Sequence, residues 1–444
     1  MGRKRNAFLL LGAAAALAAL PGCGAFKKTG KKPATMGERI SVLDYEKQVQ
    51  PEAELQGVEV LLPAQQVNAD WTQPAGNASG SMGHLALAAQ PARAWTVTIG
   101  KGSDSTRKLN APPVVAENRL FVMDTEAQVS AYDAQGGALL WRKAIQMQGE
   151  GSRPAFGGGV SVLDGRVIAT TGFGLVVAFD AGTGAELWRT RLPTPLRAAP
   201  GVDENRAYVV SQDGQLTALA ADTGAQLWDA NATVEPASIL GAGAPAIALG
   251  TVVAGFPSGE LFALRVENGR TMWQDQLSRS GRTTALGALS GITASPVIDR
   301  GRVFAVSHGG RMAALELSTG QRIWERDFAG VNAPWPAGDW VFAVTVEGEL
   351  VAMSRADGKI RWVSSLGAWK NEKKRKGAIQ WFGPVLAGNC LIVTSSEGAM
   401  ACYTPADGKL KGEVKLGSPT YLAPVVANGT LYVLTDDGKL QAWR

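Results

Sequence analysis

Histidine and cysteine are the residues of this chain that could carry proton transfer, metal binding or covalent chemistry, and the sequence holds two histidines and three cysteines. His84 and His308 lie far apart, and neither belongs to a cluster of Cys, His, Asp or Glu with the spacing of a metal site. No arrangement of Ser, His and Asp suggests a hydrolase triad. We therefore expect no catalytic residue, no metal site and no enzymatic activity.

Cys390 and Cys402 are the two cysteines whose spacing would allow a disulfide. They flank a short turn at residues 395–398, so two strands joined by that turn would bring them to one side of a hairpin. An oxidising compartment would permit the bond. The alternative is a pair of small buried side chains, since free cysteine is commonly buried. Counting thiols in the unfolded, unreduced protein separates the two interpretations.

The N-terminus has the pattern of a targeting signal. Residues 1–5 are basic, and residues 8–20 form an apolar run that is too short to cross a bilayer as a helix. We predict a signal peptide over residues 1–22. The sequence Leu20-Pro21-Gly22-Cys23 resembles the bacterial lipobox, which predicts lipidation at Cys23; the alternative is an ordinary cleaved signal that leaves a free cysteine. Gly24 favours the outer membrane, with the protein facing the periplasm.

The segment after the signal is predicted to be a linker. Residues 23–66 contain the predicted lipidated cysteine, a lysine-rich run and weak periodicity, which are typical of a flexible spacer. Residues 67–444 form the predicted folded body. When the basic residues of the signal and of the lysine run are set aside, 37 basic residues stand against 39 acidic ones. The body is therefore not basic, and nucleic acid is not an expected partner.

A repeated turn motif determines the predicted fold. Its clearest copy runs from Asp180 to Trp188, where Asp and Thr side chains shape a turn, Gly supplies a positive φ and Trp begins the next strand. The Trp is expected to pack between neighbouring repeats. The spacing between successive Trp residues, 38 to 51, fits four strands per repeat. Six turns share this Gly-to-Trp spacing: Gly137/Trp141, Gly184/Trp188, Gly224/Trp228, Gly269/Trp273, Gly320/Trp324 and Gly358/Trp362.

The number of repeats predicts a closed ring. Eight units of alternating, β-branched segments can be counted, and the last one lacks a fourth strand of its own. The sequence Ala94-Trp95-Thr96-Val97-Thr98 precedes the first unit and matches the missing strand. We therefore predict an all-β, eight-bladed β-propeller with four-stranded antiparallel blades, closed by an N-terminal strand that completes the last blade.

The motif Asp-x-x-Thr-Gly-x-x-x-Trp resembles the PQQ-type propeller repeat and covers residues 95–444. Combined with the lipobox and the linker, it is similar to the BamB family of the outer-membrane β-barrel assembly (BAM) machine. Three further stretches look like the proteobacterial members: Gly37-Glu38-Arg39-Ile40, Asn68-Ala69-Asp70-Trp71 and Gly83-His84-Leu85-Ala86-Leu87.

The resemblance implies a monomeric scaffold within a hetero-complex, docked on the POTRA domains of BamA beside other BAM subunits, with unfolded outer-membrane proteins as a further candidate partner. The family's docking loops precede the fourth and fifth blades, which here place Ile239, Leu240, Leu289 and Ile292 as partner-binding residues. The alternative role of these side chains is to cap the blade cores.

Two further interpretations remain open at this stage. The enzymatic alternative is a periplasmic PQQ-dependent quinoprotein or another ligand-binding propeller, but the chain has no adjacent cysteine pair and no acidic cluster that stands out, so we expect no cofactor. The basic run from Lys370 to Lys376 lies on a loop between blades, where it either contacts an acidic partner or lipid or is simply solvated.

Overall fold

The computed structural model describes residues 49–146, 157–234, 241, 243–277 and 291–444, which belong to the second of two compact units, residues 1–48 and 49–444. Its regular elements are strands, apart from two short 3-10 helices, η1 (Ala53–Leu55) and η2 (Glu372–Lys374). The predicted signal peptide, Cys23 and most of the predicted linker lie outside the described residues.

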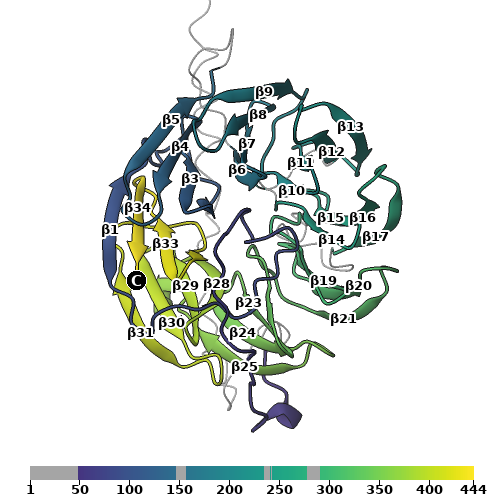
Figure 1. The fold of residues 1–444 in the computed structure, drawn as a ribbon. Coiled ribbons are helices and arrows are strands. Elements are labelled where there is room, and N and C mark those ends of the chain that lie inside the picture. The colour runs from purple at the N-terminus through teal and green to yellow at the C-terminus, as the bar shows by residue number, and fades with distance from the viewer. Residues whose placement is uncertain (1–48, 147–156, 235–240, 242, 278–290) are drawn as a thin grey trace, which may run out of the picture. The chain divides into compact units, whose positions relative to one another are not determined.

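Eight four-stranded antiparallel sheets form the blades of a propeller, which confirms the predicted fold (Figure 1). Within each blade the strands alternate in direction and follow the chain from the ring axis outward, because tight turns join each strand to its neighbour. The blades are β2 (Val114–Ala116), β3 (Arg119–Met123), β4 (Gln128–Asp133) and β5 (Leu139–Ala144) in blade 1; β6 (Gly158–Leu163), β7 (Arg166–Thr171), β8 (Leu175–Asp180) and β9 (Glu186–Arg191) in blade 2; β10 (Gly201–Asp203), β11 (Arg206–Val210), β12 (Gln215–Ala220) and β13 (Gln226–Asn231) in blade 3; β14 (Ala246–Ala248), β15 (Thr251–Gly255), β16 (Glu260–Arg265) and β17 (Thr271–Gln276) in blade 4; β18 (Val297–Asp299), β19 (Arg302–Val306), β20 (Met312–Glu316) and β21 (Arg322–Arg326) in blade 5; β22 (Trp335–Ala337), β23 (Trp340–Val344), β24 (Glu349–Ser354) and β25 (Ile360–Ser365) in blade 6; β28 (Trp381–Ala387), β29 (Cys390–Ser395), β30 (Ala399–Tyr403) and β31 (Leu410–Lys415) in blade 7; and β32 (Val425–Ala427), β33 (Thr430–Leu434), β34 (Lys439–Trp443) and β1 (Arg93–Thr98) in blade 8.

The ring closes as the sequence predicts. Strand β1 pairs antiparallel with β34, and Trp95 lies opposite Ala442 while Thr98 lies opposite Lys439. The fourth strand of blade 8 therefore comes from the N-terminal side of the propeller, and its first three strands come from the C-terminal side. This pairing leaves no blade incomplete, so the ring has no open end at which sheets could add on.

The repeated tryptophan joins each blade to the next. Trp188 of blade 2 donates its indole N–H to the carbonyl of Ala221 in the turn between the last two strands of blade 3. The glycine of that turn, Gly224, has a φ of +72°, and a Cβ there would lie 2.4 Å from the Trp188 ring. Glycine thus supplies both the turn and the space for the indole. Seven seams have this indole bond: Trp95–Gln135, Trp141–Ala181, Trp188–Ala221, Trp228–Val266, Trp273–Leu317, Trp324–Arg355 and Trp362–Pro405.

The seam between blades 7 and 8 is built differently. Gly412 occupies the position of the tryptophan in β31, and no atom lies within 4 Å of the place where its Cβ would be. Blade 8 takes its fourth strand from β1, so it has no turn of the repeated type between its third and fourth strands. A tryptophan in β31 would therefore have no carbonyl and no glycine to receive it, which explains the one departure from the repeat.

The segment before β1 forms a loop around the ring axis, which we call the axial loop and define as residues 68–85 (the dark purple trace inside the ring in Figure 1). It contacts the first strand of every blade in order, from blade 8 through blades 1 to 7. Its hydrogen bonds to the blades join Asn68 to Val426 and Asn428, Trp71 to Val115, Thr72 to Val162, Gln73 to Val202, Ala78 to Ile247, Ser79 to Ile298, Gly83 to the Trp335 indole, and Leu85 to Leu386.

The contact of the axial loop with blade 6 differs for a local reason. In blades 3, 4 and 5 the backbone N–H of the central residue of the first strand donates to the loop, as Ile247 and Ile298 do to Ala78 and Ser79. The corresponding residue in blade 6 is Pro336, which has no N–H to donate. The indole of Trp335 beside it donates to the carbonyl of Gly83 instead, at 2.7 Å.

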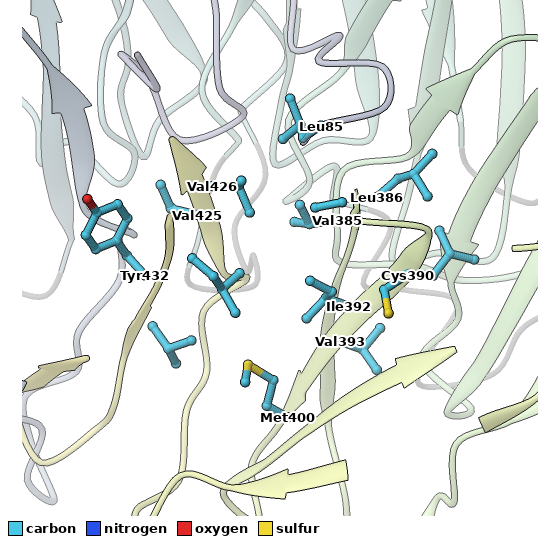
Figure 2. Close-up of a cluster of buried hydrophobic side chains, with 14 of the residues drawn as sticks. Leu85, Val385, Leu386, Cys390, Ile392, Val393, Met400, Val425, Val426 and Tyr432 are labelled. Carbon is cyan, nitrogen blue, oxygen red and sulfur yellow. The ribbon is translucent and has the colours of Figure 1, made fainter. Parts of the chain in front are cut away.

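The hydrophobic core lies between the blades and extends into the axial loop. Leu85 is 1% exposed and belongs to the same buried cluster as Val385, Leu386 and Val426. Figure 2 shows Leu85 beside Leu386 and Val385 at the inner end of blade 7. The loop is therefore part of the packed interior and is not an appendage of the ring.

Candidate functional site

The two histidines lie far apart in the fold, and His84 occupies a structural position. His84 is 4% exposed; its Nδ1 lies 2.8 Å from the carbonyl oxygen of Pro63 and donates to it, and its Nε2 accepts from the backbone N–H of Asn389 at 3.3 Å. It thereby ties the end of the axial loop to the chain that enters it and to blade 7. His308 lies in the turn after β19, where burial lowers the pKa of the imidazole. Across the described part of the chain, no three Cys, His, Asp or Glu side chains come together as metal ligands.

A buried ion pair between blades 5 and 6 also has a structural explanation. Arg355 donates to the carboxylate and to the backbone carbonyl of Asp299, and the hydroxyl of Ser81 in the axial loop donates to the same carboxylate at 2.8 Å. The guanidinium carbon of Arg355 lies 5.6 Å from the centre of the Phe304 ring. The pair thereby joins two blades and the axial loop. Because these partners satisfy both charges, neither Arg355 nor Asp299 is available as a free acid or base.

The channel along the ring axis opens toward one face, which we call the loop face because it carries the connections from one blade to the next. A funnel of about 450 Å³ at its mouth is lined by residues that include Lys108, Arg197 and Asp436, and by the edge-to-face ring pair of Phe382 and Tyr421. Polar and aromatic groups of this kind can bind a small group or a loop. The described lining contains no thiol and no imidazole that could act as a nucleophile or base.

The axial loop fills the channel from the opposite face. Pro74 and Ala75 line the inner part of the channel, a cavity of about 230 Å³. Other residues of the loop reach the turns between the first two strands of the blades; the Asp70 carboxylate accepts from the N–H of Glu117, and Asn428 donates to the carbonyl of Asn68. Among the described residues, the axial loop thus occupies the channel on the side opposite the loop face.

The structure describes one of the four predicted partner-binding residues. Ile239, Leu240 and Leu289 lie outside the described residues, in the connections that precede blades 4 and 5. Ile292 is 1% exposed and packs in a core cluster between these blades, so close to Gly255 that a Cβ on the glycine would lie 2.3 Å from its side chain. In this structure the side chain of Ile292 is therefore part of the core between blades 4 and 5.

Cys390 and Cys402 are joined by a disulfide in the structure, with Cα atoms 5.3 Å apart. They lie on β29 and β30, the second and third strands of blade 7, where Ile392 is the direct partner of Cys402. The disulfide thus joins a diagonal pair of residues on two adjacent strands of one hairpin, and it does not connect two blades.

The basic run from Lys370 to Lys376 forms a small hairpin, which we call the basic hairpin and define as residues 369–378. It consists of β26 (Trp369–Asn371), η2 and β27 (Lys376–Ala378), and it projects from the connection between blades 6 and 7. Residues 370–378 are all exposed. The connection between blades 6 and 7 therefore carries a defined, strongly basic element.

A family model described as "Outer membrane protein assembly factor BamB" matches residues 81–155, 147–364 and 367–443 of this chain. The chain belongs to the BamB family. A curated relative, the outer membrane protein assembly factor BamB of Moranella endobia (strain PCIT), is 25% identical over 360 residues, which cover 80% of this chain and 90% of that protein. The family predicted from the repeat and the length is thereby confirmed.

Solved structures extend the comparison to the fold. BamB from Moraxella catarrhalis superposes with a TM-score of 0.67 at 19% identity, covering 80% of this chain and 99% of that one. A quinohemoprotein alcohol dehydrogenase from Comamonas testosteroni superposes with a TM-score of 0.65 at 15% identity, covering 84% of this chain and 80% of the enzyme. At this level of identity the likeness to the dehydrogenase concerns the fold alone.

The axial loop is the part of the site region that the sequence analysis did not identify. In the sequence, two of its stretches, Asn68-Ala69-Asp70-Trp71 and Gly83-His84-Leu85, stand out only by their likeness to the BamB family. In the structure each stretch packs against the blades, and the side chains of Trp71 and Leu85 are only 2% and 1% exposed. Two strongly apolar residues in a segment without periodicity were the available signal.

Proposed function

We propose that this chain is a non-enzymatic scaffold lipoprotein of the BAM complex, which docks on the POTRA domains of BamA and assists the assembly of β-barrel proteins into the outer membrane. Membership of the BamB family is the observation that carries the proposal. A closed ring held by seven indole bonds and by the axial loop supports it, because rigid blades can present loops in fixed positions. The absence of a metal-ligand cluster from the described residues is compatible with a scaffold.

Attachment to the outer membrane through Cys23 is part of the same proposal. The lipobox sequence and the acyl chains it would receive give a stable anchor. No helix within the described residues is long and apolar enough to span a bilayer. The lipidated cysteine and residues 24–48 would then connect the membrane to the described chain, which meets the ring at Val49, packed against a core cluster of blades 5 and 6, and at Glu52, whose N–H donates to the carbonyl of Ile360 in blade 6.

The loop face is the proposed docking surface. Leu240 precedes blade 4 and Leu289 precedes blade 5, and the described residues near them, Gly241 and Thr293, line the funnel on this face. We propose that these two apolar side chains contact BamA, and that Ile292, which packs against Gly255, holds the second connection in place. Charging Ile292 would disturb the core as well as the contact, so it is a poor probe of docking.

Capture of BamA tests the docking proposal. The variants Leu240→Asp and Leu289→Asp should weaken co-purification of BamA from detergent-solubilised envelopes, since a charge at an apolar contact must lose its water. Leu249→Asp is the matched control, because Leu249 is 83% exposed in the turn at the opposite end of β14. Equal capture by all three variants, with unchanged circular dichroism, would refute the assignment of the docking loops.

A further inference from the structure

The basic hairpin is an ordered element, and most of its charge is not paired with any described residue. The Asn371 side chain accepts from the N–H of Lys374, and a Glu372 carboxylate oxygen accepts from the N–H groups of Ala368 and Trp369. Arg375 adopts a left-handed conformation, with a φ of 46°, at the end of η2. The hairpin is thus held by hydrogen bonds between its own side chains and its own backbone, and not by burial.

Four cations at the tip have no ion pair among the described residues: Lys373, Lys374, Arg375 and Lys376. Lys370 at the base is paired with Glu397 at 2.7 Å, and the one acidic side chain of the hairpin, Glu372, is used by backbone N–H groups. Four like charges on consecutive residues repel one another. An external anionic surface would relieve this repulsion, whereas nothing in the described fold does so.

The composition of the tip distinguishes between two kinds of anionic surface. Lysine is depleted in protein interfaces, and tight protein contacts depend on buried aromatic or arginine anchors. The tip offers three lysines and one arginine, and its nearest apolar side chains, Trp369 and Ile379, are partly buried at the base. A lysine-rich cluster without an apolar anchor suits the diffuse attraction of anionic lipid headgroups.

We propose that the basic hairpin binds the anionic headgroups of a phospholipid surface as a second, electrostatic contact beside the lipid anchor. The hairpin follows β25, and the chain leading from the proposed anchor meets the start of the same strand, where Arg361 donates to the carbonyl of Val58. Both contacts therefore belong to the two ends of one strand of blade 6. Together they would restrict how the tethered ring can turn relative to the membrane.

Vesicle binding tests this proposal without the anchor. The mature chain carrying Cys23→Ser is sedimented with vesicles of phosphatidylcholine that contain phosphatidylglycerol, and with vesicles of phosphatidylcholine alone. Each basic residue near an anionic surface is worth about fivefold in partitioning, so two of the four cations in contact give roughly 30-fold stronger binding to the anionic vesicles. Binding should fall steeply as salt is added, because added ions screen the charges.

Two neutralised variants locate the binding. The variant K373Q/K374Q/R375Q/K376Q should lose most of the binding to anionic vesicles. The matched control, K143Q/R270Q/K411Q/K415Q, removes the same number of exposed charges from the outer strands and one turn, and it should keep the binding. Unchanged thermal midpoints in both variants would show that the fold is intact, which is expected because all eight side chains are exposed.

Three outcomes would overturn the inference. If the hairpin variant and its matched control bind anionic vesicles equally well, the hairpin is not the binding site. Loss of binding only in K27Q/K28Q/K31Q/K32Q would assign it to the segment after Cys23. Unchanged vesicle binding with lost BamA capture in the hairpin variant would point to an acidic protein surface. The inference deepens the proposed function, and the two can fail separately, since Leu240→Asp is read by BamA capture and the hairpin variant by vesicle binding.

Discussion

Gln73→Met tests whether the axial loop contributes to the stability of the ring. The Gln73 side chain is 4% exposed and pairs with blade 3 as a strand would, since its amide donates to the carbonyl of Val202 at 2.7 Å and its oxygen accepts from the N–H of Val202 at 3.0 Å. Val202 is 1% exposed and lies in β10, the innermost strand of its blade. Methionine has a similar length and cannot make either bond.

The expected loss follows from the two backbone groups that the substitution leaves unpaired. Each buried N–H or C=O without a partner costs about 1–3 kcal/mol. A thioether costs less to bury than an amide, and this difference offsets part of the loss. We expect the free energy of unfolding to fall by roughly 2–4 kcal/mol. Urea unfolding followed by tryptophan fluorescence measures the change, and hydrogen exchange at the amide of Val202 should speed up more than exchange in the outer strands.

The control for Gln73→Met is Gln65→Met, in the same N-terminal segment but at an exposed position. Surface substitutions of this kind change stability by less than about 0.5 kcal/mol. If the two variants unfold at the same urea concentration, the loop is dispensable for the stability of the ring. If Gln73→Met unfolds earlier while exchange at Val202 stays slow, the loss arises elsewhere and the pairing argument fails.

Three other measurements test the seams, the disulfide and the charge of the ring. Trp188→Phe should lower the free energy of unfolding by about 1–3 kcal/mol, because the carbonyl of Ala221 loses its donor, and a loss below this range would contradict the role given to the indole. Replacing Cys390 and Cys402 by alanine should cost about 3 kcal/mol for a closed loop of this length, and the unfolded, unreduced wild type should show neither of these thiols to a thiol reagent. Burial, together with a neighbouring carboxylate, raises the pKa of Glu349 above its ordinary value of 4.5, so the folded state loses stability as the pH rises through that raised pKa. Glu349→Gln should therefore raise the melting temperature at pH 7 and match the wild type below pH 4. A difference in melting temperature that stays constant across this pH range would refute the assignment.

The ring could be predicted from the sequence because its information is local and repeated. A turn such as Asp180–Gly184 is held by its own residues: the Asp180 carboxylate accepts from the N–H and hydroxyl of Thr183, bonds that also hold the pKa of Asp180 below its ordinary value. Each copy needs only the next copy to complete its Trp contact. The pairing of β1 with β34 could be predicted for the same reason, because it supplies the one strand that the count of repeats lacks.

The axial loop and the basic hairpin could not be predicted in the same way. The bonds of the loop join residues far apart in the chain, such as Asn68 and Val426, and nothing in residues 68–85 repeats. Only the folded ring brings eight first strands to one axis, where one extended segment can satisfy their free N–H and C=O groups. The charge of the hairpin can be read from the sequence. The left-handed conformation of Arg375 and the backbone N–H bonds accepted by Glu372, which make the hairpin an ordered element, are seen only in the folded chain.

One continuous segment both stabilises the ring and leads toward the proposed anchor, and the order of its contacts separates the two roles. Three polar contacts join this segment to blade 6 before it reaches the axis: Glu52 bonds Ile360, Glu54 forms an ion pair with Lys359, and Arg361 bonds Val58. These contacts precede the axial loop, so a pull on the tether would strain them before any residue that holds the blades together. His84 then joins the end of the axial loop to Pro63, so the loop is also held where the chain enters it. A pull from the proposed anchor would therefore load the contacts with blade 6 before it loads the axial loop that holds the blades together.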